Sequence, residues 1–196
     1  MKLSLSTMSF FASFILKNNV DISLIIRKVL ACLRKCDVEY ALTGMIPGII
    51  FYGVPIASTT DMDILIFFEK DHGEEKMRKL FSCLESCGFK KEGLFKFSDE
   101  ETGFGVDLML IYEDSPQLIK DAFKHRKLVS LEGTNTYVVD RKYFTLLKLL
   151  RGKHKDYYHL SEWVKSGRIS LREIEEWARE YNLILAIEEL RKWIED

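Results

Sequence analysis

The chain has 196 residues, of which 47% are hydrophobic and 12% aromatic, and its formal net charge is -1. This length and composition fit one domain, or one domain with a small appendage, and they exclude an intrinsically disordered protein. The near-zero net charge excludes binding to nucleic acid through bulk charge, so any such contact must come from a local basic patch.

In the first 20 residues, a single Lys at position 2 precedes an apolar stretch over residues 8–16. This stretch has neither the long apolar region nor the A-x-A-like cleavage site of a secretory signal. No segment of the chain approaches the ~20 consecutive apolar residues of a membrane-spanning helix. We therefore expect a soluble, cytoplasmic protein that makes no contact with a membrane.

The spacing of apolar residues and turn residues predicts alternating helices and strands up to about residue 140. In chain order the predicted elements are a helix over 21–36 with Asp21 as N-cap, a strand over 38–43, a turn and short helix over 45–53, a strand over 61–68, a helix over 73–88, a hairpin over 93–112 whose second arm is 104–112, a capped helix over 114–125, and short strands near 126–131 and 135–140.

From Arg141 onward the pattern is helical to the end of the chain. The predicted helices cover 141–151, 156–166, 170–180 and 183–194. We therefore expect an α/β part over 1–140, followed by a helical C-terminal region over 141–196.

Four cysteines fall in two pairs at helical spacing, Cys32 with Cys36 and Cys83 with Cys87. Each pair lies on one face of a predicted helix. If the two helices pack together, these side chains could form a zinc site or a cross-helix disulfide. We favour the simpler interpretation that each cysteine is a small buried hydrophobic residue.

Aspartates interrupt two apolar strands, Asp61 and Asp63 in one and Asp107 in the other. Asp61 and Asp63 point to the same face of their strand, where they repel each other. If the strands are neighbours, three carboxylates converge, and nothing in the sequence pairs them with a strand-borne Lys or Arg. Such a cluster is tolerable when its oxygens hold a hard divalent cation. In the alternative interpretation, Asp61 caps the strand start and Asp63 faces solvent at a sheet edge.

The order of Gly44, Asp61-Met62-Asp63 and Asp107 resembles the signature of the DNA polymerase β-type nucleotidyltransferase superfamily. In that signature a Gly-Gly or Gly-Ser turn precedes a D-x-D motif, and a third acid follows on an adjacent strand. The stretch YALTG…YGVP…STTDMDI is similar to the AbiEii-type toxins and related minimal nucleotidyltransferases, and so is the tail 148-KLLRGKHKDYYHL-160. The resemblance covers roughly residues 38–165.

The resemblance implies an α+β nucleotidyltransferase fold. Its mixed β-sheet would have helices packed mainly on one face, and the small helical C-terminal part would close over the cleft. The catalytic residues implied are Asp61, Asp63, Asp107, Lys148 and Asp156, of which the first three would hold Mg²⁺ or Mn²⁺ and the last would orient a base or a lysine. The nucleotide-binding residues implied are Thr43, Gly44, Met45, Ser58, Thr59, Thr60, Lys153 and Lys155.

The sequence departs from the family pattern at three places. Met45 follows Gly44 where the family usually has Gly or Ser, so we expect its side chain to crowd the phosphates. The arginine that many relatives carry shortly before the D-x-D is replaced by Pro55-Ile56-Ala57, and His159 stands where the family's tail has a final acid. These losses weigh against activity more than against the fold.

The segment 141–155 contains six Lys or Arg residues and no acid. Such a run can be an ordinary solvated helix face. Because we expect this run to lie beside the predicted metal site, we favour a surface that faces phosphates. The nearby Tyr143, Tyr157 and Tyr158 could stack on a base or fill the core.

The function implied is metal-dependent transfer of a nucleoside monophosphate from an NTP, such as ATP, to a hydroxyl group. The acceptor would be RNA, notably tRNA, or a protein, as in toxin-like relatives that work within toxin–antitoxin pairs; a small molecule is also compatible. The alternative is a catalytically weak or inactive protein of the same fold that binds a nucleotide or a partner in a regulatory or antitoxin-like role. A third hypothesis is a metal-dependent nuclease that uses the same acids.

Overall fold

The computed structural model describes residues 22–53, 61–68, 73–131 and 133–195. The elements are α2 (Ile22–Lys35), β1 (Tyr40–Leu42), α3 (Met45–Tyr52), β2 (Asp61–Phe67), α4 (Gly73–Ser86), β3 (Phe89–Lys91), β4 (Lys96–Asp99), β5 (Gly105–Ile111), α5 (Gln117–Lys124), β6 (Lys127–Leu131), β7 (Thr134–Val138), α6 (Arg141–Arg151), α7 (His154–Lys165), α8 (Leu171–Glu180) and α9 (Ile184–Glu195).

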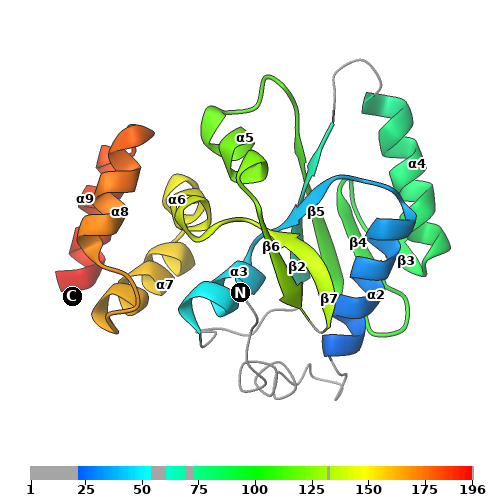
Figure 1. The fold of residues 1–196 in the computed structure, drawn as a ribbon, viewed down its shortest axis with the longest axis horizontal. Helices are drawn as coiled ribbons and strands as arrows, with labels where there is room; N and C mark the ends of the chain where they lie inside the picture. Colours follow the sequence, from blue (N-terminus) through cyan, green and yellow to red (C-terminus); the bar gives the residue numbers. More distant parts are fainter. Residues whose placement is uncertain (1–21, 54–60, 69–72, 132, 196) are drawn as a thin grey trace.

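The described strands form one mixed sheet in the order β3-β4-β5-β2-β1-β7-β6 (Figure 1). β2 runs parallel to β5 and β1 runs parallel to β7, whereas the other neighbouring pairs are antiparallel. In the β2–β5 pair, Asp63 lies directly beside Asp107. The predicted α+β fold is confirmed, and the two strands that carry the acids are neighbours.

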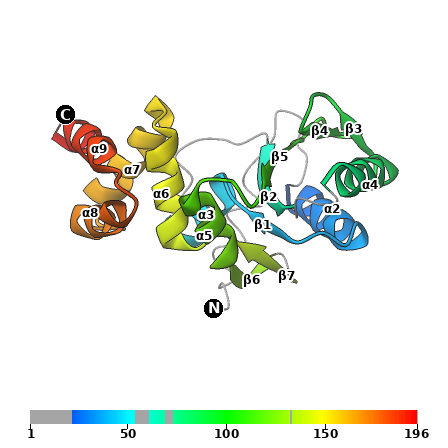
Figure 2. The ribbon, with the colours of Figure 1, turned by 90° about the horizontal axis from the view of Figure 1, so that it is seen from above.

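Helices cover both faces of the sheet, which corrects the expectation of helices mainly on one face (Figure 2). Side chains alternate between the faces along β2, as a strand requires. Met62, Ile64 and Ile66 pack into a core cluster with α2 and α4. Leu65 packs into a second cluster with residues of α5, α6 and α7. Asp61 and Asp63 share the face of Leu65, so they face the C-terminal helices.

Most predicted elements are present within two or three residues of their predicted bounds, with two local differences. The short strand β3 was not expected, because only Phe89 in it is buried and the two lysines that follow are exposed. The predicted side-chain cap of α5 is wrong: Pro116 occupies the N-cap position and no side chain caps the helix. The predicted N-cap Asp21 lies outside the described residues.

The C-terminal helices lie on one side of the sheet, with α6 between the sheet and helices α7 to α9 (Figure 1). Tyr52 of α3 stacks on Trp163 of α7 with 4.3 Å between the ring centroids, and both belong to the second core cluster. A capping box of Ser170 and Glu173 begins α8. The helical region is therefore packed onto the sheet, and its division from the α/β part at residue 140 stays a prediction.

The four cysteines come together between α2 and α4, where they form the disulfides Cys32–Cys87 and Cys36–Cys83. This corrects the preferred interpretation that each is simply a small buried residue. Across the described part of the chain, none of the helices has the length and apolar character that crossing a bilayer would need.

Candidate active site

Three carboxylates meet on one face of the sheet at the start of β2 and β5. Asp63 is half-buried and adjoins Asp107 across a strand spacing of about 4.8 Å, and Asp61 projects from the same face two residues earlier. Burial raises the pKa of the Asp63 carboxyl, and the charges of Asp61 and Asp107 raise it further. The charges of Arg151 and Lys155 act in the opposite direction, but the pKa of Asp63 remains raised.

Gly44 makes room for the Asp63 carboxylate. Its φ of 67° lies in the left-handed region, and a Cβ at this position would lie 1.9 Å from Asp63 Oδ2. The backbone N–H of Thr43 donates to the Asp63 carbonyl at 2.9 Å, which fixes this turn against β2. We expected glycine at position 44 to let the triphosphate approach the backbone. In this structure the group that needs the space is the Asp63 carboxylate.

Met45 begins α3, directly after Gly44. Its side chain packs against the core cluster of α2 and α4, on the opposite face of the sheet from the aspartates. Met45 is half-buried in this position, and the expectation that it crowds the phosphates stays a prediction.

A lysine pairs with one of the three acids, contrary to the expectation that no strand-borne cation does so. Lys96 of β4 lies opposite Asp107 of β5, and its ammonium lies 2.9 Å from Asp107 Oδ2. The Lys96 side chain is 68% exposed, so a ligand can displace it at little cost. The predicted hairpin could have suggested this contact, but only with the strand register known.

A cleft of about 220 Å³ opens beside the carboxylates, between the sheet and α6. Its lining residues are Thr43, Gly44, Asp63, Met109, Ile119, Phe144, Leu147, Lys148, Leu150 and Arg151. Its lining combines the polar residues Thr43, Asp63, Lys148 and Arg151 with an apolar majority. This arrangement can bind a planar or apolar group while its charged end reaches the carboxylates.

A buried ionic network forms the α6–α7 wall of the cleft. The Asp156 carboxylate is fully buried, and it accepts from Lys148 Nζ at 3.0 Å and from Arg151 Nε at 2.6 Å. His159 Nδ1 lies 3.3 Å from the same ammonium. Sequence reasoning paired Asp156 with a lysine, and this contact is present; it did not single out Arg151, whose side chain is 36% exposed and reaches the cleft.

The pKa shifts in this network follow from burial and charge. Burial opposes ionisation of Asp156, but hydrogen bonds from Arg151 and the charge of Lys148 hold its pKa below the ordinary value. Burial lowers the pKa of Lys148, although Asp156 acts in the opposite direction. Burial and the nearby Lys148 charge lower the pKa of His159 to about 4. Lys148 therefore pairs with Asp156 in this structure, and its role in neutralising phosphate stays a prediction.

Of the remaining predicted binding residues, the structure describes only the two lysines at the start of α7. Lys153 and Lys155 are exposed at the start of α7, and the positive charge of Lys155 lowers the pKa of Asp63. Ser58, Thr59 and Thr60 lie outside the described residues. Arg151 lines the cleft together with Asp63, and the charges of Arg151 and Lys155 both lower the pKa of Asp63.

The carboxylates fit a hard divalent cation. Asp61, Asp63 and Asp107 offer only oxygen donors, which Mg²⁺ and Mn²⁺ prefer. Burial first, and then the charges of Asp61 and Asp107, raise the pKa of Asp63, and a bound cation would favour its charged form. These three residues are the ones that could hold the metal.

No known protein family and no curated protein matches the sequence. Among solved structures, the chain is similar to an antigenic nucleotidyltransferase-like protein from Paracoccidioides brasiliensis, with a TM-score of 0.55 and 17% identity over 88% of this chain and 92% of that chain. The chain has the nucleotidyltransferase fold.

Two further structures have weaker likeness. One is the antibiotic-resistance factor ANT(2'')-Ia, with a TM-score of 0.46 and 15% identity over 87% of this chain and 89% of that chain. The other is JHP933 from Helicobacter pylori, with a TM-score of 0.43 and 15% identity over 99% of this chain and 95% of that chain. At these identities the likeness concerns the fold alone, and the closeness to AbiEii-type toxins stays a prediction.

Proposed function

We propose that the protein is a divalent-metal-dependent nucleotidyltransferase that moves a nucleoside monophosphate from an NTP to a hydroxyl acceptor. The observation that carries the proposal is the pairing of Asp63 and Asp107 on parallel neighbouring strands, with Asp61 on the same face, beside a cleft. A sheet gains no stability from three adjacent carboxylates, so a metal-binding role is the better account of their placement.

Each group in the site has a part that its position supports. When bound, Mg²⁺ or Mn²⁺ would activate the attacking hydroxyl and stabilise the leaving pyrophosphate. Asp107 would also accept the proton of the acceptor hydroxyl. Arg151 and Lys155 supply positive charge for the phosphates beside Asp63, and the apolar wall around Leu147 can contact the base.

The acceptor is proposed on chemical grounds. The exposed lysines at the start of α7 suit an RNA acceptor such as tRNA, because its backbone phosphates would extend past the site. A protein acceptor and a toxin–antitoxin partnership remain the alternatives that the AbiEii-like motifs suggest.

One observation favours a second function, nucleotide binding without transfer. Lys96 occupies one oxygen of Asp107 at 2.9 Å and so competes with a metal for that ligand. If this ion pair persists in solution, the site would bind a nucleotide in a regulatory role but would lack its third metal ligand.

The deciding experiment incubates the protein with each α-labelled NTP, Mg²⁺ or Mn²⁺, and extracts of total RNA and protein. Label on a macromolecule, absent from Asp61→Ala/Asp63→Ala, is expected. The matched control is Glu100→Ala/Glu101→Ala, which removes two exposed adjacent carboxylates from the turn between β4 and β5. Calorimetric NTP binding without label would favour the second function, and RNA cleavage with metal but without NTP would favour a nuclease.

A further inference from the structure

Four cysteine sulfur atoms cluster between α2 and the end of α4, away from the three aspartates. Cys32 and Cys36 lie one turn apart on α2, and Cys83 and Cys87 lie at the same spacing at the end of α4. All four Sγ atoms lie within 4.8 Å of one another. The within-helix pair Cys32 and Cys36 has its sulfurs 3.7 Å apart.

We propose that these four cysteines, in their thiolate form, bind one zinc ion that ties α2 to α4. In a four-thiolate site with Zn–S bonds of about 2.3 Å, the edges of the tetrahedron measure about 3.8 Å. The 3.7 Å separation within α2 matches such an edge, and all other separations lie below 4.8 Å. Small movements of side chains therefore suffice to surround a metal.

The zinc form and the disulfide form differ by one zinc ion and four electrons, because the four sulfurs have lost their protons in both. A newly made chain carries four thiols, and zinc binding releases their protons without any transfer of electrons. Formation of Cys32–Cys87 and Cys36–Cys83 instead removes four electrons and four protons, which requires an oxidant, and it uses up all four ligands. The structure displays this oxidised arrangement, and the same packing of α2 on α4 serves the reduced, metal-bound one.

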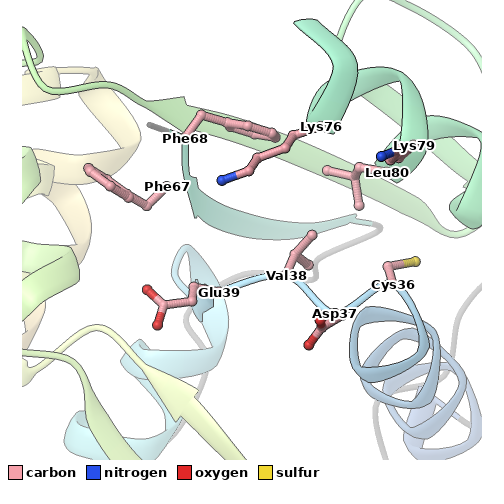
Figure 3. A pocket seen from close by; sticks show the side chains of 9 residues that line it. All are labelled: Cys36, Asp37, Val38, Glu39, Phe67, Phe68, Lys76, Lys79 and Leu80. Atoms are coloured by element: carbon pink, nitrogen blue, oxygen red, sulfur yellow. The ribbon is translucent and has the colours of Figure 1, made fainter. Parts of the chain in front are cut away.

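The cluster can be reached by a metal ion. Cys32 is buried, but the other three cysteines are half-buried. Cys36 also lines a hollow of about 410 Å³ together with Lys76 and Lys79 (Figure 3). Two lysines and two acids, Asp37 and Glu39, line this hollow, so a cation can approach Cys36 without crossing a surface of one charge.

This site is separate from the carboxylates. The hollow beside Cys36 is lined by Phe67 and Phe68 at the end of β2, whereas Asp61 and Asp63 stand at its beginning. Thiolates select zinc, and carboxylates select Mg²⁺ or Mn²⁺. The zinc proposal therefore stands or falls independently of nucleotidyl transfer.

The test titrates zinc into the full chain after reduction and anaerobic removal of the reductant, in competition with a chromophoric chelator. We expect about one tight zinc per chain. The tight site should be lost in Cys32→Ser/Cys36→Ser and kept in Asp63→Asn, which alters only the carboxylate cluster. Absence of a tight site, or a site that Asp63→Asn removes, would overturn the proposal.

A second measurement begins with the wild-type chain, so its first readout does not depend on the folding of a variant. Co²⁺ added to the reduced wild-type chain should give the absorption bands of cobalt bound to thiolates, and zinc should bleach them. The variants Cys36→Ser/Cys83→Ser and Cys32→Ser/Cys36→Ser should lose the bands equally. A purely disulfide role predicts no cobalt bands, and it predicts that only Cys36→Ser/Cys83→Ser retains a cross-link between the helices, as Cys32–Cys87.

Discussion

The Asp63 carboxylate fills the space that a side chain at Gly44 would need, with its Oδ2 atom 1.9 Å from where a Cβ would stand. Gly44→Ala should therefore push the Asp63 carboxylate away from Asp107 and abolish metal-dependent nucleotide binding. The left-handed backbone of Gly44 adds a loss of stability of about 1–2 kcal/mol. Calorimetry with NTP and Mg²⁺, together with thermal unfolding, would measure both effects.

Gly103→Ala is the matched control for Gly44→Ala. Gly103 has a φ of 71°, close to that of Gly44, but a Cβ there would meet no atom within 4 Å. The control should show the backbone penalty and normal nucleotide binding. Equal binding losses in the two variants would mean that the contact between Gly44 and Asp63 does not shape the site.

Asp63→Asn should stabilise the metal-free protein while it removes metal binding. The folded-state pKa of Asp63 is raised above its unfolded value of about 3.9. The charged form therefore destabilises the fold at neutral pH, and this penalty is relieved as the pH falls through the folded pKa. The stability advantage of Asp63→Asn over wild type should thus be largest near pH 7 and shrink toward pH 4.

Thermal unfolding with EDTA and with Mg²⁺ measures both halves of this prediction. Mg²⁺ should raise the melting temperature of the wild type and leave that of Asp63→Asn unchanged, since only a ligand of the native state stabilises it. A variant less stable than the wild type in EDTA would show that Asp63 has a structural partner instead of a metal.

The sequence alone was enough to identify the three aspartates and to predict the strands that carry them, because both depend on local pattern. Asp61, Asp63 and Asp107 stand out against apolar strands, and the alternation of β2 places the first two on one face. That reasoning required β2 and β5 to be neighbouring strands, and in the structure they are paired.

The parts that escaped prediction depend on how distant elements pack. The Lys96 contact needs the β4–β5 register, and the position of Arg151 needs the angle at which α7 brings Asp156 to α6. The core packing of Met45 depends on the direction of the first turn of α3. The cysteine cluster likewise needs α2 and α4 side by side, which two separate helical patterns cannot indicate.

Lys155→Ala should weaken NTP binding about tenfold, because a charge-assisted contact to phosphate contributes about 1.5–3 kcal/mol before screening at an exposed site. The positive charge of Lys155 lowers the pKa of Asp63, so we expect Lys155 to act on phosphates bound beside that carboxylate. Lys165→Ala, at the other end of α7, is the control and should bind normally. Equal affinities in both variants would contradict the phosphate role.

Asp156→Asn should destabilise the protein by about 3–5 kcal/mol, because it leaves the buried Lys148 and its neighbour Arg151 without their counter-charge. The pKa of Asp156 is lowered in the fold, so its stabilising effect is present above the unfolded pKa and is lost as the pH falls through the folded one. Urea unfolding at pH 7 gives the difference. Glu189→Gln, which breaks the exposed pair with Lys192, should leave the stability almost unchanged.

His159 should make the wild-type protein lose stability as the pH falls from about 6.5 to about 4. Burial and the charge of Lys148 lower the folded-state pKa of His159 to about 4, so the unfolded chain takes up a proton first in this interval. The folded state keeps a neutral ring whose Nδ1 accepts from Lys148 at 3.3 Å. His159→Gln should lack this part of the pH dependence.

An NMR titration of the His159 ring would measure its pKa directly. A midpoint near 4 is expected in the wild type, and Lys148→Met should move it upward because the second cause of the shift is removed. A wild-type midpoint near 6.5 would mean that the ring is solvated and that the network of Lys148, Asp156 and His159 opens in solution. The α6–α7 wall would then be too loose to hold Arg151 at the cleft, and nucleotide binding should weaken together with the network.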